Sequence, residues 1–165
     1  MVVNSTAPYL VAIDEAVNVT ANQLLAKLMD IIEETVYSYD STWTNGYNGD
    51  AGRTGQFKQS WEASRAVITG NIIESKIFQN YVKMSYIEPF SHGSAYYNGA
   101  LDENGLNRII EEGIPNTGIG FPEVMRRPFW ENFKQYVDEN LEILFMQNCR
   151  AFGLDLKSGV ISATF

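Results

Sequence analysis

Hydrophobic residues recur at helical spacing in a first stretch near the N-terminus. They share one face of the expected helix, and the opposite face carries the charged residues Lys27, Asp30, Glu33 and Glu34. The apolar positions are Leu24, Leu25, Leu28, Ile31, Ile32 and Val36. Thr20 and Gln23 have the spacing of a capping box, in which both side chains satisfy free backbone amides. The pattern therefore predicts a helix that begins at Thr20, after an N-terminal arm of residues 1–18.

A second helical stretch begins at Pro128, whose missing N–H suits the first turn of a helix. Its apolar face consists of Phe129, Phe133, Val137, Leu141, Leu144, Phe145 and Phe152. Gly153 is the type of residue that ends helices. At 1.5 Å per residue, this helix would be about 35 Å long. Phe129 is predicted to be core, Cys149 is predicted to be a buried small hydrophobe, and Trp130 fits either core or surface.

Between the two predicted helices, the pattern of hydrophobic residues becomes typical of strands. Residues 63–69 and 72–79 flank Gly70-Asn71, a pair that favours a tight turn, so we expect a β-hairpin here. Residues 81–84 are also β-rich. Residues 154–156 and 160–165 each have the composition of a closing strand. These elements predict an α+β fold, with a mainly antiparallel sheet packed by two long helices.

Residues 39–55 are rich in Gly, Asn and Asp, which tolerate positive φ, and predict a long mobile loop. Trp43 and Tyr47 within it indicate a loop that makes contacts rather than a plain linker. We expect residues 1–165 to form a single domain, with residues 157–165 as a C-terminal extension.

Composition narrows the functional classes. The hydrophobic fraction of 45% is that of a folded protein, and the net charge of -8 repels phosphate, which disfavours sequence-reading nucleic-acid binding. One cysteine allows neither an intramolecular disulfide nor a cysteine-based zinc cluster. The first residues lack the basic start of a signal peptide, and the apolar runs are too short to cross a bilayer. We expect a protein kept in a cytoplasm, with no membrane partner.

No catalytic, metal or cofactor motif is found. His92, the sole histidine, lies in Ser91-His92-Gly93-Ser94, and its expected role is structural, with the ring hydrogen-bonded to a loop backbone. Nucleophile-elbow, EF-hand and phosphate-loop patterns are missing. The acids are spread over helix faces, so we expect no enzyme and no cofactor. A small hydrolase or nuclease that uses scattered carboxylates remains a remote alternative. A soluble binding or accessory protein, such as an immunity or anti-host factor, is another.

Three segments resemble, in order, the tail-completion family of long-tailed bacteriophages. Arg53-Thr54-Gly55-Gln56-Phe57-Lys58-Gln59-Ser60-Trp61 resembles the family's opening to its sheet. Ile109-Ile110-Glu111-Glu112-Gly113 resembles the run that precedes a variable loop. Arg126-Arg127-Pro128-Phe129-Trp130 is similar to the start of the family's C-terminal helix. Tail terminator and head-completion (stopper) proteins of the same neck are the alternatives.

The resemblance implies a structural virion protein at the head–tail interface, assembled in the host cytoplasm as a hexameric ring. Its implied partners are further copies of itself, the tail tube protein and the head-side neck proteins, and DNA would pass through without sequence-specific binding. Head-to-tail rings need two different patches on each subunit. Arginines and aromatics are enriched in interfaces, so the candidate residues are Trp43, Tyr47, Arg126, Arg127 and Trp130. In the alternative, the arginines pair with local acids.

Overall fold

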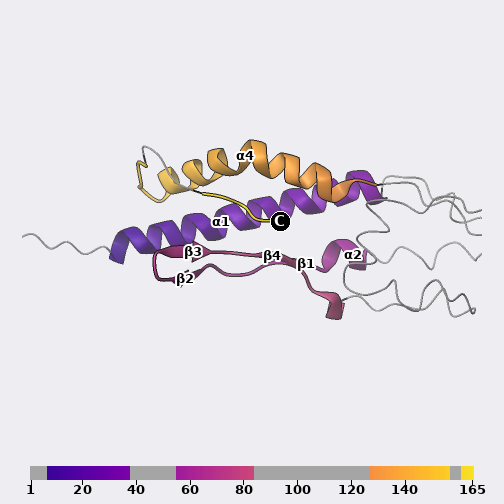
Figure 1. The fold of residues 1–165 in the computed structure, drawn as a ribbon, viewed down its shortest axis with the longest axis horizontal. Coiled ribbons are helices and arrows are strands. Elements are labelled where there is room, and N and C mark those ends of the chain that lie inside the picture. Colours follow the sequence, from indigo (N-terminus) through magenta and orange to yellow (C-terminus); the bar gives the residue numbers. More distant parts are fainter. Residues whose placement is uncertain (1–6, 38–54, 84–126, 157–160) are drawn as a thin grey trace, which may run out of the picture. The chain divides into compact units, whose positions relative to one another are not determined.

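The computed structural model describes residues 7–37, 55–83, 127–156 and 161–165 (Figure 1). Its helical elements are α1 (Ala7–Ile32), a π-helical turn η1 (Glu33–Tyr37), α2 (Gln56–Gln59), a 3₁₀ turn η3 (Tyr81–Lys83) and α4 (Phe129–Ala151). Its strands are β1 (Trp61–Ala63), β2 (Val67–Thr69), β3 (Ile72–Glu74) and β4 (Ile77–Gln79). Helices and antiparallel strands together make an α+β fold. None of the helices within these ranges has both the length and the apolar character needed to cross a membrane.

The chain divides into two compact units. Unit 1 comprises residues 1–27, 62–78 and 133–165, and unit 2 comprises residues 28–61 and 79–132. The predicted single domain stays a prediction. The strands form two separate two-stranded sheets, β1–β4 and β2–β3, so the predicted packing of a larger sheet by the two helices also stays a prediction.

In unit 1, helix α1 begins at Ala7, so the predicted start at Thr20 is wrong. The Thr20 hydroxyl donates to the Ala16 carbonyl at 2.7 Å, a bond made inside a helix rather than at its cap. Residues 7–18, expected to form part of an arm, belong to the helix. Within this stretch, Ala12, Ile13, Ala16 and Val17 pack in the core. Pro8 lies in the first turn, where its missing N–H costs no hydrogen bond.

The core of unit 1 joins α1, α4 and the chain that follows α4. Its buried residues are Ala16, Phe145, Cys149 and Leu154, and the partly buried residues packed against them are Ala12, Ile13, Val17, Leu156 and Ile161. Burial of Cys149 is therefore confirmed, and it raises the pKa of the thiol above its usual value.

The end of α4 at Gly153 is also confirmed. Gly153 has φ +79°, and its N–H donates to the Arg150 carbonyl at 3.0 Å, while the Leu154 N–H donates to the Cys149 carbonyl at 2.8 Å. This pair of bonds is a Schellman motif, which satisfies carbonyls at the helix end and reverses the chain. Lys134, near the start of α4, places its Nζ 5.4 Å from the centre of the Phe165 ring. Phe165 therefore lies beside the N-terminal half of α4, at the opposite end of the helix from Gly153.

The closing strands predicted for residues 154–156 and 160–165 are wrong for all the residues described, 154–156 and 161–165, which are not strands. Leu154, Leu156 and Ile161 instead bury their side chains against the helix pair. The apolar spacing of this segment therefore reflects packing against the helices and not pairing of its backbone with a strand.

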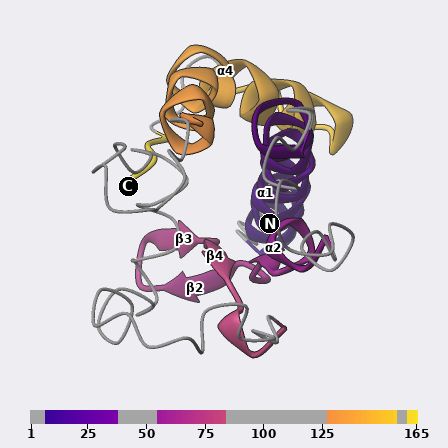
Figure 2. The ribbon, with the colours of Figure 1, turned by 90° about the vertical axis from the view of Figure 1, so that its right-hand side faces the viewer.

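The predicted hairpin is confirmed. Strands β2 and β3 pair antiparallel with Thr69 opposite Ile72, so Gly70 and Asn71 form a two-residue turn (Figure 2). Gly70 has φ +61°, a conformation that glycine adopts without strain.

The hairpin contains a β-bulge below its tip. The Ser64 N–H donates to the Lys76 carbonyl at 2.7 Å, and Val67 lies opposite Glu74. Between these two pairs, the first strand advances by one residue more than the second, which is the definition of a bulge. The Ala66 N–H at the bulge donates to Asn18 Oδ1 of α1 at 2.6 Å. Helix α1 therefore satisfies the backbone group that the bulge releases.

The extra residue sets which side chains face outward. Along residues 72–79, the even-numbered positions Ile72, Glu74, Lys76 and Phe78 are exposed, whereas the odd-numbered positions are half-buried or buried. Val67 and Thr69 lie opposite Glu74 and Ile72, so they share the outward face.

Candidate interaction site

In unit 2, the π-helical turn η1 after helix α1 contacts Arg127, which lies two residues before the start of α4. The Nη1 of Arg127 donates to the carbonyl of Val36, in the π-helical turn, at 3.2 Å. The last carbonyls of a helix have no partner inside the helix, and a cation there also interacts favourably with the helix dipole. Arg127, predicted as an interface residue, therefore contacts the π-helical turn that follows α1.

Four aromatic side chains pack beside this contact and form the aromatic cluster: Phe57, Trp61, Phe129 and Trp130. The rings of Phe57 and Phe129 meet edge to face with centroids 5.3 Å apart, and Trp61 stacks on Trp130 with centroids 5.4 Å apart. Phe129 is 1% exposed, which confirms its core prediction. Trp130 is half-buried, so it contributes one face to the cluster.

Ser60 holds the backbone around this cluster in place. Its hydroxyl donates to the Phe57 carbonyl at 2.7 Å and accepts from the Gln79 side-chain amide at 3.1 Å. Its carbonyl accepts from the Asn80 N–H at 2.6 Å. Ser60 and Gln79 are both buried, so these bonds replace those that water would otherwise make.

Asn80 explains why residues 81–83 are not the strand that was predicted. The Lys83 N–H donates to the Asn80 carbonyl at 3.1 Å, and the Val82 N–H donates to the Asn80 side-chain oxygen at 3.2 Å. Such local bonds from an asparagine compete with strand pairing and favour a turn.

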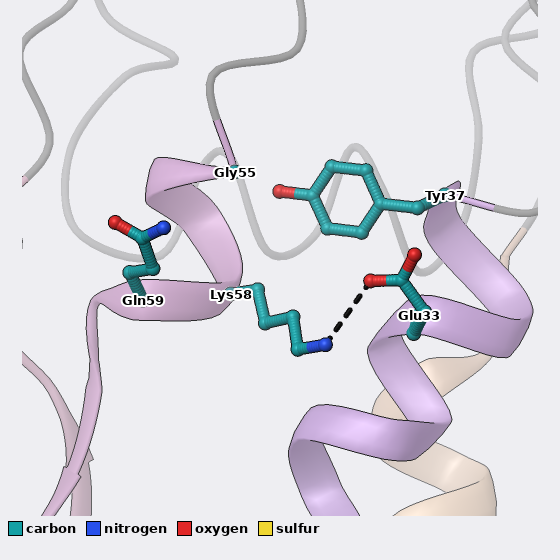
Figure 3. Close-up of a pocket in the computed structure, with 5 residues that line it drawn as sticks. All are labelled: Glu33, Tyr37, Gly55, Lys58 and Gln59. Atoms are coloured by element: carbon teal, nitrogen blue, oxygen red, sulfur yellow. Dashed lines mark hydrogen bonds and ion pairs between the residues drawn. The ribbon is translucent and has the colours of Figure 1, made fainter.

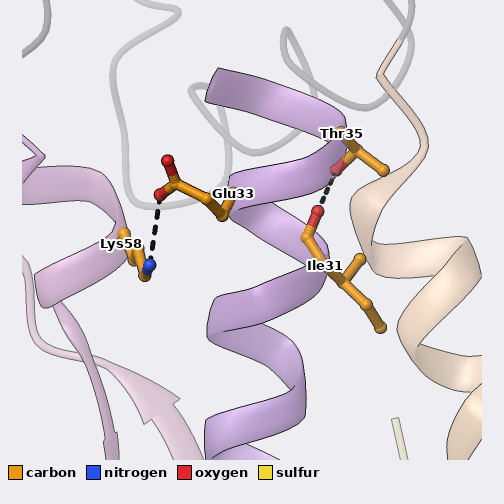
Figure 4. Close-up of polar contacts among 4 residues, drawn as sticks. All are labelled: Ile31, Glu33, Thr35 and Lys58. Carbon is orange, nitrogen blue, oxygen red and sulfur yellow. Dashed lines mark hydrogen bonds and ion pairs between the residues drawn. The ribbon is translucent and has the colours of Figure 1, made fainter. Parts of the chain in front are cut away.

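An open pocket of about 340 Å³ lies next to the start of α2. It is lined by Glu33, Tyr37, Gly55, Lys58 and Gln59 (Figure 3). Lys58 Nζ is 3.1 Å from Glu33 Oε2 (Figure 4), and these side chains are 31% and 60% exposed. The ion pair is therefore solvated and contributes little stability. Over the part of the chain that the structure describes, no group of three or more His, Cys, Asp or Glu residues could hold a metal ion.

The described residues that bound the two long undescribed segments all lie in unit 2. Tyr37 and Gly55 bound residues 38–54, and Lys83 and Arg127 bound residues 84–126. Four of the residues named from the sequence lie outside the described residues: Trp43, Tyr47, His92 and Arg126. The middle segment of the resemblance, residues 109–113, also lies outside them. The two interface residues that are described, Arg127 and Trp130, both lie in unit 2.

In unit 1, a polar contact between α1 and α4 was not predicted from the sequence. The side-chain amide of Asn148 donates to the Thr20 hydroxyl and to Gln23 Oε1, both at 2.9 Å. A buried hydroxyl and amide that satisfy each other fix the register of the helices. The position of Asn148 among the apolar residues of the second helix could have indicated a buried polar group. Its partners on α1 are remote in sequence, so local spacing does not identify them.

Compared with known proteins, the chain matches no family model, no curated protein and no solved structure.

Proposed function

We propose that this chain is a structural virion protein, a tail-completion component that forms a ring and joins the tail of a long-tailed bacteriophage to its head. The observation that carries the proposal is the aromatic cluster. Two of the three segments that resemble this family, residues 53–61 and 126–130, supply all four of its rings. These two segments are about 70 residues apart in the sequence, and they resemble the same family in the same order. Their packing against each other supports a structural relationship with that family.

In this role, the aromatic cluster and the Arg127–Val36 contact stabilise the fold of the chain. Arg126, Arg127 and Trp130 remain proposed interface residues. Trp43 and Tyr47 are the proposed contact residues of the loop over residues 39–55. The ring would surround passing DNA, and an acidic protein with a net charge of -8 would not retain phosphates on its wall. Further copies of the chain, the tail tube protein and head-side neck proteins are the proposed partners.

The first test is a double substitution in the loop, Trp43→Ala with Tyr47→Ala. The melting temperature should stay within a few degrees of wild type, because the proposal assigns these two residues to contacts with partners and not to the fold of the chain. Incorporation of the protein into particles should fall, as measured by immunoblot of purified virions. Equal incorporation of this variant would exclude the loop as a contact element.

The second test is electron microscopy of a lysate of the parent virus in which the gene for this chain is inactivated. The proposal expects filled heads and separate tails that do not join. Joined and infectious particles would contradict it. Tails of irregular length would instead favour the tail terminator, and heads that lose their DNA would favour the stopper.

A further inference from the structure

The last part of the chain covers one side of the core of unit 1. Leu156 and Ile161 are half-buried and pack against the core cluster of α1 and α4 that contains Cys149. Leu156 and residues 161–165 together are named the strap. Figure 1 shows residues 161–165, in yellow, alongside α4. The apolar side of the helix pair therefore has a known cover, which is a segment of the same chain.

The strap is held less firmly than the helices that it covers. Its residues belong to neither a helix nor a strand, and residues 162–165 are exposed. The ring of Phe165 has its centre 5.4 Å from Lys134 Nζ and is 53% exposed, and a cation–π contact contributes little at an exposed site. The half-buried side chains of Leu156 and Ile161 are therefore the main apolar contacts of the strap with the core.

The helix pair beneath the strap has stronger contacts of its own. The side-chain amide of Asn148 on α4 donates to the Thr20 hydroxyl and to Gln23 Oε1 on α1, both at 2.9 Å. The N–H of Leu154 donates to the Cys149 carbonyl at 2.8 Å, which ties the residue just before the strap to the last turn of α4. Folded chains open first where few apolar side chains are buried, and chain ends open most readily. The strap should therefore leave the core before the helices separate.

We propose that the strap opens as a unit while α1 and α4 stay paired, so that unit 1 has a closed state and an open state. In the closed state, the strap keeps water and other molecules from the apolar side chains against which it packs. In the open state, this side of the helix pair becomes accessible although the helices are intact. The inference concerns unit 1 alone and makes no use of the neck role, so either can fail without the other.

Cys149 reports on the opening, because it is the single cysteine of the chain and is 0% exposed. Its thiol can react with N-ethylmaleimide only when the sulfur is accessible. The rate of labelling of the full chain, followed by mass spectrometry, therefore measures how often the strap is open. Wild type should react far more slowly than the chain unfolded in urea. Equal rates would mean that the strap does not close over the core, and would refute the proposal.

Substitutions in the strap should raise this rate in a definite order. Ile161→Ser should raise it about tenfold, because the closed state loses the burial of an isoleucine side chain. Phe165→Ala should raise it about two- to fivefold, the contribution of an exposed cation–π contact. The matched control, Ile72→Ser, makes the same replacement at a position of the hairpin that is 67% exposed, and should leave the rate unchanged. A rate that Ile161→Ser does not raise, or that Ile72→Ser raises equally, would overturn the proposal.

A further variant separates opening of the strap from unfolding of the helices. Leu24→Ala creates a cavity at a buried position of α1 outside the core cluster beneath the strap. It destabilises the closed and the open state alike, because the helices are paired in both. The urea midpoint of unfolding should therefore fall, while the rate of labelling of Cys149 stays at the wild-type value. A rate that rises in step with the loss of stability would show that Cys149 reacts only through unfolding, and the strap would not open by itself.

Discussion

The aromatic cluster of unit 2 and the tip of the hairpin in unit 1 (Val67, Ile68 and Ile72) are both built from large apolar side chains, yet they differ in burial. In the cluster, rings from two distant segments cover one another, so their hydrophobicity stabilises the fold. At the tip of the hairpin, valine and isoleucine remain exposed although the chain is folded. Hydrophobicity along the sequence is therefore the same signal in both regions. Only burial in the folded chain separates the side chains that stabilise the fold from those that stay exposed.

The largest effect should come from the cluster. Phe129→Ala should reduce the free energy of unfolding by about 3–5 kcal/mol, because it opens a cavity among packed rings. Urea denaturation followed by tryptophan fluorescence measures this loss. Val82→Ala, at an exposed position, should stay within about 0.5 kcal/mol of wild type. A loss below about 1 kcal/mol for Phe129→Ala would mean that the cluster does not hold unit 2 together.

A smaller effect is expected from the polar contact of unit 1. Asn148→Ala should cost about 1–3 kcal/mol, because it removes the donor to the buried Thr20 hydroxyl. A double-mutant cycle with Thr20→Val isolates the pair, and its coupling energy should be at least about 0.5 kcal/mol. Additive losses would show that the two side chains do not interact in solution.

The smallest effect should be that of the exposed ion pair beside the pocket. Lys58→Ala should change the free energy of unfolding by less than about 1 kcal/mol, because both charges are solvated. The change should shrink further when salt is added, which screens exposed charges. A loss above about 2 kcal/mol that persists at high salt would indicate that other parts of the chain bury this pair.

Local patterns in the sequence predicted the parts of the fold that depend on local contacts. The buried stripe on α1, the glycine that ends α4 and the turn at Gly70-Asn71 are all confirmed. The start of α1 was missed because Thr20 resembles a helix cap, and its actual role is to meet Asn148 on another helix. The bulge was missed because its released N–H is satisfied by Asn18, which is remote in sequence.

Of the candidate site, the sequence predicted the burial of Phe129 but not its neighbours. Phe57 and Trp61 are about 70 residues away, and no local spacing relates them to the start of α4. The capping contact of Arg127 was missed for the same reason, because the Val36 carbonyl that it binds is a backbone group with no signature in the sequence.

The proposed tail-completion role requires this chain to act by shape, as a stoichiometric part of a particle, and not by turnover. Its most direct test adds purified protein to a lysate of the parent virus that lacks it and counts infectious particles. The account predicts a titre that rises in proportion to added protein and reaches a plateau at a fixed ratio of copies per tail. Full recovery from trace amounts, far below one copy per tail, would show catalysis and contradict the account.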